Sequence, residues 1–204
     1  MKKTLKSILV IALVALSMNV NAQSVGIQAG YVSSTQTDND AISGFQVGPT
    51  AELQIQGNFA LQYGISYTYL SNKETVLGTD INYTGHFIDV PVRLKASFPI
   101  SSDLSLFAFG GPNFQIGIAE NVKTFTQIGS TDFETNTNLY KMDEDEDNKN
   151  DLDRLNLQLG VGGGVQFKSV QLKVGYDWGL FDLNKMEDVN MKRSQLTASI
   201  GYMF

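Results

Sequence analysis

The sequence contains no cysteine. This absence excludes a lipid-anchored lipoprotein, a disulfide framework, and any thiolate metal site or nucleophile. A basic stripe is also missing, because 15 lysines and arginines stand against 21 acidic residues and the net charge is −6. A nucleic-acid partner would need such a stripe, so we expect no nucleic-acid binding.

Long hydrophobic runs are absent except for one, from Ile8 to Leu16, which follows Lys2, Lys3 and Lys6. It is well short of the ~20 apolar residues that a membrane-spanning helix needs. The small residues around Val20-Asn21-Ala22 suit cleavage, so residues 1–22 are predicted to be a signal peptide. The mature chain, 23–204, is then one domain, and loss of three lysines brings its net charge to −9.

Hydrophobic residues in the rest of the chain recur with a period of two, which predicts strands. From Phe59 to Tyr69 every odd position is apolar or aromatic, and the positions between are polar or small. Eight segments alternate in this way: 25–31, 45–55, 59–69, 88–98, 104–118, 155–167, 170–180 and 196–204.

The connections between these segments alternate strictly between short and long. The short connections are Gly57-Asn58, Pro99 to Asp103, and Lys168-Ser169. Long polar loops are expected near 34–43, 71–82, 120–152 and 182–192. Outer-membrane barrels have short periplasmic turns and longer extracellular loops, whereas a soluble sandwich has no reason to sort its loops. We therefore predict an all-β fold, an eight-stranded antiparallel up-and-down transmembrane β-barrel in lipid of the cell outer membrane.

Two segments resemble a known family. The run from His86 to Lys95 resembles the fourth strand of the PorT-like outer-membrane β-barrel proteins, and Gly175 to Leu180 resembles their penultimate strand. The likeness spans essentially the whole mature chain and implies location and fold more firmly than activity. The ending Gly201-Tyr202-Met203-Phe204 looks like the signal that the barrel-assembly machinery reads, so that machinery is an expected partner through Phe204.

Catalysis is not expected. The only histidine, His86, shares its face with Ile88 and Val90 and should point to lipid or headgroups, whereas Asp89 should face inward. Ser66 and Asp89 are therefore poor partners for it, and no base, nucleophile and orienting group converge. No catalytic, cofactor-binding or metal residues are predicted, and no cofactor.

An acidic stretch from Asp143 to Asp153 has carboxylates at alternate positions, as a calcium loop would. Counted as an EF-hand, position six is Asn148 instead of glycine and position twelve is Arg154 instead of glutamate. The match fails at both diagnostic positions, so a solvated acidic loop is favoured over loose divalent-cation binding.

The interior should be filled by side chains, because eight strands leave little space inside. Phe107 and Phe109 face inward, and Gly162 and Gly164 on the neighbouring strand should make room for their rings. Inward charges must pair in a narrow interior, and Glu52 is predicted to pair with Arg93 or Lys173. A charged, ion-selective constriction is the alternative to this plugged barrel.

The expected function is that of a structural or accessory outer-membrane protein whose extracellular loops make contacts. The partner is an unidentified extracellular or envelope protein. An accessory subunit of an envelope secretion or gliding machine is the second hypothesis, and a narrow solute channel the third.

Overall fold

The computed structural model describes residues 23–37, 40–76, 79–128, 131–140, 153–183 and 191–204. The predicted signal peptide, 1–22, lies outside these residues. The described segments form strands joined by turns, with these bounds: β1 (Gln23–Gln36), β2 (Ile42–Gln56), β3 (Phe59–Gly64), β4 (Ser66–Val76), β5 (Thr79–Pro99), β6 (Leu104–Ile128), β7 (Thr131–Asn138), β8 (Leu155–Phe167), β9 (Val170–Gly179) and β10 (Arg193–Met203).

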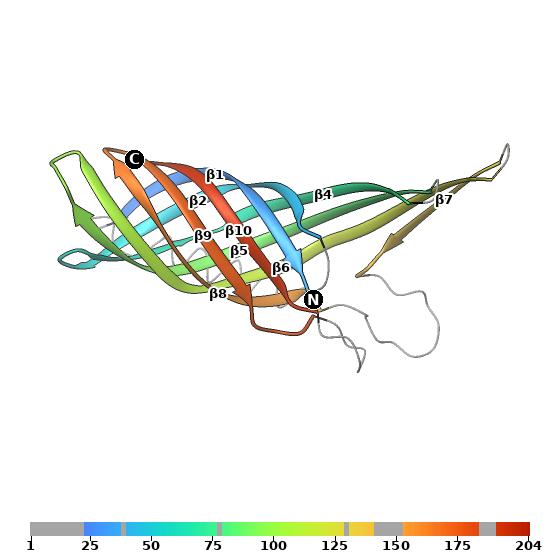
Figure 1. The fold of residues 1–204 in the computed structure, drawn as a ribbon. Helices are drawn as coiled ribbons and strands as arrows, with labels where there is room; N and C mark the ends of the chain where they lie inside the picture. Colours follow the sequence, from blue (N-terminus) through green and yellow to red (C-terminus); the bar gives the residue numbers. More distant parts are fainter. Residues whose placement is uncertain (1–22, 38–39, 77–78, 129–130, 141–152, 184–190) are drawn as a thin grey trace.

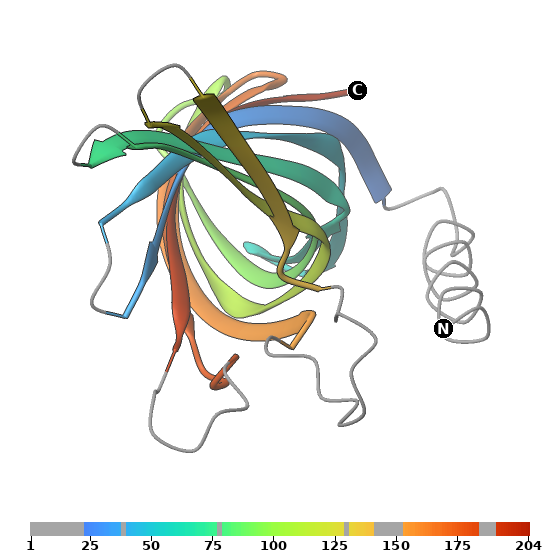
Figure 2. The same ribbon diagram turned by 90° about the vertical axis from the view of Figure 1, so that its right-hand side faces the viewer.

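The strands close into a ring. β1 pairs with both β2 and β10, and the remaining antiparallel pairings join each strand to its neighbours around the barrel. β3 and β4 together make one barrel strand, and β7 pairs only with the outer part of β6, so the ring has eight strands. Figure 2 shows the ring from one end. The predicted all-β, eight-stranded antiparallel barrel is confirmed.

The division between β3 and β4 falls at Ile65, opposite Pro49 of β2. The Ile65 N–H donates to the Pro49 carbonyl at 3.2 Å. Proline has no N–H with which to return a bond, so the ladder between β2 and its neighbour is interrupted there and resumes at Val47 and Tyr67.

The three predicted tight turns are present at one end of the barrel. Gly57 lies in the turn after β2 with a φ of 58°, a conformation that glycine adopts at little cost. Lys168, in the turn between β8 and β9, has a φ of 52°. The ends of the chain that the structure describes, at β1 and β10, lie side by side in the sheet.

Two of the segments expected as loops are largely strand. β4 and β5 pair from Ser66 to Val76 and leave only residues 77–78 between them, so 71–82 is a β-hairpin. β6 continues to Ile128 and β7 returns beside it, so the first part of 120–152 is a second hairpin. Polar residues occupy both faces of these hairpins, which removes the alternation that identifies a strand in a sequence. The first loop is also shorter than 34–43, because β1 reaches Gln36 and β2 begins at Ile42.

The wall of the barrel is apolar outside and polar inside. Ile200 and Leu172 are more than half exposed, whereas Gln158 and Lys95 are at most 1% exposed. A soluble protein would bury the first pair and expose the second. This inverted arrangement is stable where hydrocarbon surrounds the wall.

No helix within the described ranges is long and apolar enough to cross a membrane.

Candidate functional site: a filled interior and a projecting sheet

The part of the interior near the tight turns, called the lower interior below, contains an ion pair between Glu52 on β2 and Lys95 on β5. Lys95 Nζ lies 2.7 Å from Glu52 Oε1 and 2.9 Å from Oε2. Gln62 and Gln171 also donate to Glu52 Oε1, at 2.7 and 2.8 Å. The carboxylate therefore receives donors from three other strands of the barrel.

The predicted partner of Glu52 was wrong. Register places Gln62 of β3 directly between Glu52 and Arg93, and Gln62 itself bonds to Glu52. Lys95 instead lies opposite Ala60, whose small side chain leaves the longer lysine room to reach Glu52. In this barrel, Glu52 therefore pairs with the lysine that reaches it past a small side chain, and not with the arginine that is level with it.

Arg93 reaches across the barrel from β5 to Asp177 on β9. Its guanidinium forms a salt bridge with that carboxylate and also donates to the Gly111 carbonyl. Asp177 lies opposite Gly160 of β8, where no side chain stands between the two groups. Both charged side chains are at least nine-tenths buried.

Asp89 lies at the centre of a cluster in which every hydrogen-bond donor is a neutral side chain. Thr68 and Asn113 each donate to its carboxylate at 2.7 Å, and Gln115 donates at 3.2 Å. The sequence correctly placed Asp89 inside. The described residues give it no salt bridge within 4 Å, so amide and hydroxyl donors stabilise this carboxylate.

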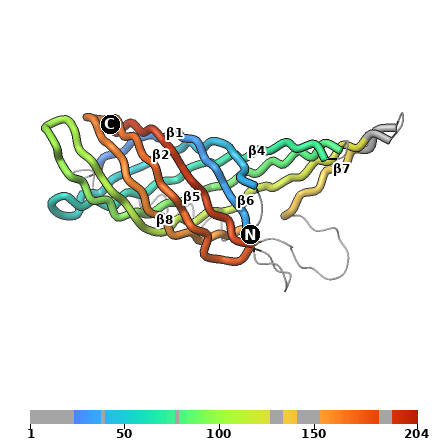
Figure 3. Tube along the Cα trace, in the orientation of Figure 1, coloured from blue at the N-terminus to red at the C-terminus, as the bar shows by residue number. Residues whose placement is uncertain are grey.

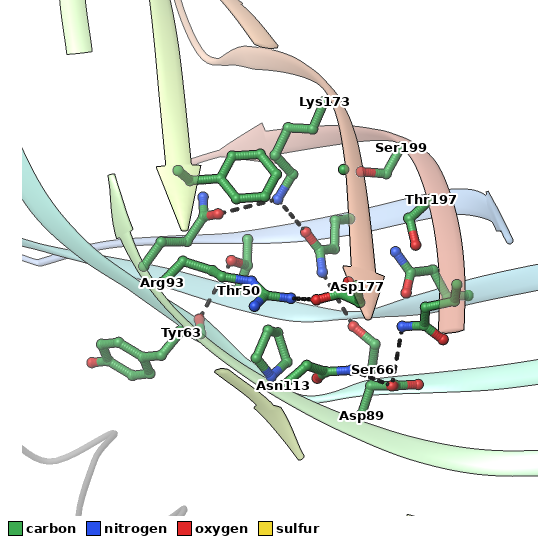
Figure 4. Close-up of a pocket in the computed structure, with 17 residues that line it drawn as sticks. Thr50, Tyr63, Ser66, Asp89, Arg93, Asn113, Lys173, Asp177, Thr197 and Ser199 are labelled. Atoms are coloured by element: carbon green, nitrogen blue, oxygen red, sulfur yellow. Dashed lines mark hydrogen bonds and ion pairs between the residues drawn. The ribbon is translucent and has the colours of Figure 1, made fainter. Parts of the chain in front are cut away.

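Among the described residues, Lys173 forms hydrogen bonds only with neutral acceptors. Its Nζ donates to Gln28 Oε1 at 2.6 Å and to Gln62 Oε1 at 3.5 Å. Figure 4 shows Lys173 and Asp89 at opposite sides of a polar cavity of 60 Å³ that Arg93 and Asp177 also line. A cavity of this size holds a few water molecules.

The expected fit between the inward phenylalanines and the glycines of β8 is confirmed. Phe107 lies opposite Gly164, and Phe109 lies opposite Gly162. A Cβ atom at either glycine would collide with the facing ring. The two rings occupy the space that these glycines leave, 6.3 Å apart between centroids.

His86 lies on the outer face, as the sequence predicted. Its Nδ1 is 2.6 Å from the Tyr67 hydroxyl, and its ring packs 5.2 Å from that of Tyr69. Asp89 points to the interior, and Ser66 accepts a bond from Gln28 instead. The histidine is therefore part of an aromatic group on the wall.

The mouth of the barrel opposite the tight turns is closed by side chains from several segments. Val32, Leu70 and Phe87 form a buried apolar cluster, and the Arg193 guanidinium lies 4.6 Å above the Phe87 ring. Arg193 is in turn 2.6 Å from Glu120 Oε1. An apolar layer thus lies beneath a buried ion pair.

Two tyrosines complete this closure. Tyr83 and Tyr140 donate to the two oxygens of Glu120, at 2.5 and 2.7 Å. Burial, followed by the nearby Glu120 carboxylate, raises the pKa of Tyr140, which keeps its hydroxyl protonated as a donor. Tyr140 also packs with Leu183, which joins the segment after β7 to the segment after β9.

A sheet projects beyond the mouth. The outer parts of β4, β5 and β6 continue past the ring, and β7 is added at their edge, as Figures 1 and 3 show. β7 pairs with β6 along one side, and no described strand pairs with its other side. The sheet therefore presents an open strand edge outside the barrel.

The acidic stretch 143–153 lies almost wholly outside the described residues, and so does most of the loop near 182–192. Within the described ranges, no group of three or more histidine, aspartate or glutamate side chains is placed to hold a metal ion.

Comparison with known families decides the identity. The model of a family described as outer membrane protein beta-barrel domain matches residues 12–185. The chain belongs to this family. It is a small β-barrel of the outer membrane, and the projecting sheet and the closed mouth are parts of that barrel.

Several solved structures are similar to this outer-membrane barrel. The attachment invasion locus protein Ail of Yersinia pestis is 14% identical with a TM-score of 0.44, covering 89% of this chain and 98% of that one. Neisserial surface protein A is 16% identical with a TM-score of 0.47, covering 90% and 98%. The outer membrane enzyme PagL is 10% identical with a TM-score of 0.45, covering 86% and 98%. No curated protein matches the chain.

Sequence reasoning missed the closure of the mouth of this outer-membrane barrel. Glu120, Arg193 and Tyr140 come from three segments whose contact depends on how the outer strands and loops fold back. One signal was available, because Phe87 and Leu70 are large apolar residues at inward positions of otherwise polar-faced strands. Such residues indicate an apolar layer inside the barrel.

Proposed function

We propose that this outer-membrane barrel is a non-catalytic structural or accessory protein that contacts another envelope or extracellular protein through its projecting sheet. The observation that carries the proposal is the open edge of β7, which extends outside the ring. An open edge offers backbone donors and acceptors to an extended segment of a partner. The closed interior supports a role in contact over one in transport.

The absence of catalysis is part of the same proposal. His86 contacts Tyr67 and Tyr69, and the described interior carboxylates are occupied by amides, hydroxyls or cations. The Tyr67 hydroxyl is the one polar partner that the described residues give His86, and no described carboxylate orients the histidine ring, since Asp89 points to the interior.

A finer hypothesis is that the chain is a PorT-like protein serving a secretion or gliding machine of the envelope. The resemblance of His86–Lys95 and of Gly175–Leu180 to strands of that group supports it. Delivery to the membrane would use the barrel-assembly machinery, through the last strand and Phe204.

Native pull-down from detergent-solubilised membranes tests the proposal. One variant replaces residues 122–137 with an Asn-Gly turn, which removes the outer part of β6 and most of β7. The matched control shortens the other hairpin by replacing residues 74–81 in the same way. We expect a protein that co-purifies with the wild type and the control and is lost from the first variant.

Heat-modifiable migration in gels establishes that both variants fold. An identical set of co-purifying proteins in all three samples would contradict the contact role of β7. Identification of the lost protein as a secretion or gliding component would support the finer hypothesis, and any other surface protein would refute it.

A further inference from the structure

A continuous row of aromatic rings crosses four strands on the outer wall. Cross-strand register joins Tyr31 to Phe45, Phe45 to Tyr69, and Tyr69 to His86. The rings of Phe45, Tyr69 and His86 pack together, with centroids 5.6 Å apart for Phe45 and Tyr69 and 5.2 Å apart for Tyr69 and His86. The row ends at small residues on both sides, Ala198 and Ala119. These four side chains form one platform, which the two alanines bound at the ends of the row.

A second row, made of hydroxyl side chains, lies beside the first. Two residues further toward the extracellular end of each strand, register joins Ser33 to Ser43, Ser43 to Ser71, and Ser71 to Thr84. All four are at least partly exposed. The rows are in contact, because the Tyr31 hydroxyl is 2.6 Å from Ser43 Oγ.

The opposite neighbours of the aromatic row belong to the lipid-facing wall. Two residues toward the periplasmic end, the same four strands carry Ala29, Val47, Tyr67 and Ile88. Moving outward along these strands, the surface therefore changes from mainly aliphatic side chains, with the single ring of Tyr67 packed against Phe45 and His86, to aromatic and then to hydroxyl side chains. It is continuous with the membrane-embedded face, so its occupant is the headgroup of a lipid whose chains lie on that face.

Charge selects the kind of headgroup. None of the eight residues in the aromatic and hydroxyl rows is a lysine, an arginine or a carboxylate. The next outward-facing residue on β4 is Lys73, whose ammonium is 3.5 Å from Asp80. A phosphate would find no free cation within the two rows. A sugar ring stacks its C–H face on the negative face of an aromatic ring and bonds its hydroxyl groups to serine and threonine.

The same barrel also carries an aromatic pair of the ordinary kind that anchors a barrel at the membrane interface, and its surroundings differ from those of the platform. Tyr176 and Trp178 on β9 pack edge to face, with centroids 5.1 Å apart. Their cross-strand neighbours are Val161, Leu196 and Leu159, all aliphatic. That pair suits acyl chains and has no hydroxyl row beside it.

We propose that the platform of Tyr31, Phe45, Tyr69 and His86, with its hydroxyl row, binds the uncharged sugar headgroup of an outer-leaflet glycolipid. This site is separate from β7, so it stands or falls independently of the proposed protein contact.

Lipid retention measured by native mass spectrometry tests the site. The full barrel is purified in lauryldimethylamine oxide, because a maltoside detergent would itself offer sugars. It is then mixed with diglucosyl dioleoylglycerol, dioleoylphosphatidylcholine or dioleoylphosphatidylglycerol, which share the same acyl chains. We expect the diglucosyl lipid to be retained in preference to the other two.

Variants localise the effect. Tyr69→Leu should lower retention of the diglucosyl lipid about tenfold relative to the phosphatidylcholine, the size of effect expected for one aromatic contact. Ser43→Ala removes one hydroxyl without disturbing packing and should lower it by a smaller factor. Tyr176→Leu, at the aliphatic-flanked pair, is the matched control and should leave it unchanged.

Equal retention of the three lipids would overturn the proposal, and so would preference for the anionic one. Equal losses in Tyr69→Leu and Tyr176→Leu would reduce the platform to a general anchor and overturn it as well. If Tyr69→Leu fails to fold, Ser43→Ala alone decides, because an unchanged selectivity in that variant contradicts the hydroxyl row's role.

Discussion

Glu52 and Lys95 form an ion pair across Ala60 inside the barrel, with 2.7 Å between Oε1 and Nζ. The lysine side chain is 1% exposed, so water cannot replace the carboxylate if it is lost. The neutral neighbours Gln62, Gln166 and Gln171 orient the pair without supplying charge. The salt bridge with Glu52 is therefore what compensates the buried charge of Lys95.

Glu52→Gln should destabilise the folded barrel by about 3 kcal/mol, because it leaves Lys95 charged and uncompensated. Urea unfolding in micelles, followed by tryptophan fluorescence, measures the change. The double variant Glu52→Gln/Lys95→Met should recover most of the loss. Asp80→Asn, which breaks an exposed pair with Lys73, is the control and should have little effect. A Glu52→Gln barrel as stable as the wild type would show that the pair is dispensable.

Gly164→Ala should destabilise the barrel by about 1–3 kcal/mol, because the added methyl group meets both the Leu172 backbone carbonyl and the Phe107 ring. Adding Phe107→Leu should relieve the contact with the ring, but not the contact with the carbonyl, and so restore only part of the stability. Gly110→Ala is the matched control, since a Cβ atom there meets no atom closer than 3.5 Å. Equal effects at Gly164 and Gly110 would mean that the ring does not require the glycine.

Purified barrels should give no steady single-channel conductance in planar bilayers. The apolar cluster around Phe87, the Glu120–Arg193 pair and the interior glutamines fill the described interior, as expected for a barrel of only eight strands. An open porin in the same bilayers verifies that insertion is detectable. Reproducible conductance steps from the barrel would support the ion-selective constriction instead.

Trypsin added to intact cells should cut between Lys141 and Arg154 and leave Lys168 uncut. The first segment belongs to the third predicted extracellular loop, mostly outside the described residues, and Lys168 lies in a tight turn at the opposite end. Permeabilised cells serve as the control, because there Lys168 becomes accessible. Mass spectrometry of the fragments locates the cuts, and cleavage at Lys168 in intact cells would reverse the orientation.

Phe204→Ala should lower the amount of barrel that reaches the membrane without lowering the stability of barrels already inserted. The Phe204 side chain is 77% exposed. Its backbone N–H donates to the Val25 carbonyl at 2.8 Å, and the substitution keeps this bond. Phe167→Ala, on a neighbouring part of the same rim, is the control. Pulse-chase assembly assays give the yield, and unchanged insertion kinetics would remove Phe204 as the residue that the assembly machinery reads.

The sequence by itself determined the barrel, because lipid outside and polar contacts inside force an alternation with period two along each strand. Phe59 to Tyr69 carries that alternation plainly, and the tight turns at Gly57-Asn58 and Lys168-Ser169 fix the up-and-down order. The inward side of Asp89 and the outward side of His86 follow from the same counting. The match of Phe107 with Gly164 also follows, since both lie a similar distance from their turn.

Only the tertiary structure decided which of the inward charges pair. Counting along one strand gives the face that a residue occupies but not which side chain stands between two charges. Glu52 is level with Arg93, but Gln62 lies between them, and Lys95 reaches Glu52 past the small Ala60. The projecting hairpins lack alternation because water lies on both their faces, so 71–82 looked like a loop. The Glu120–Arg193 pair joins strands far apart in sequence, and only the closing of the ring brings them together.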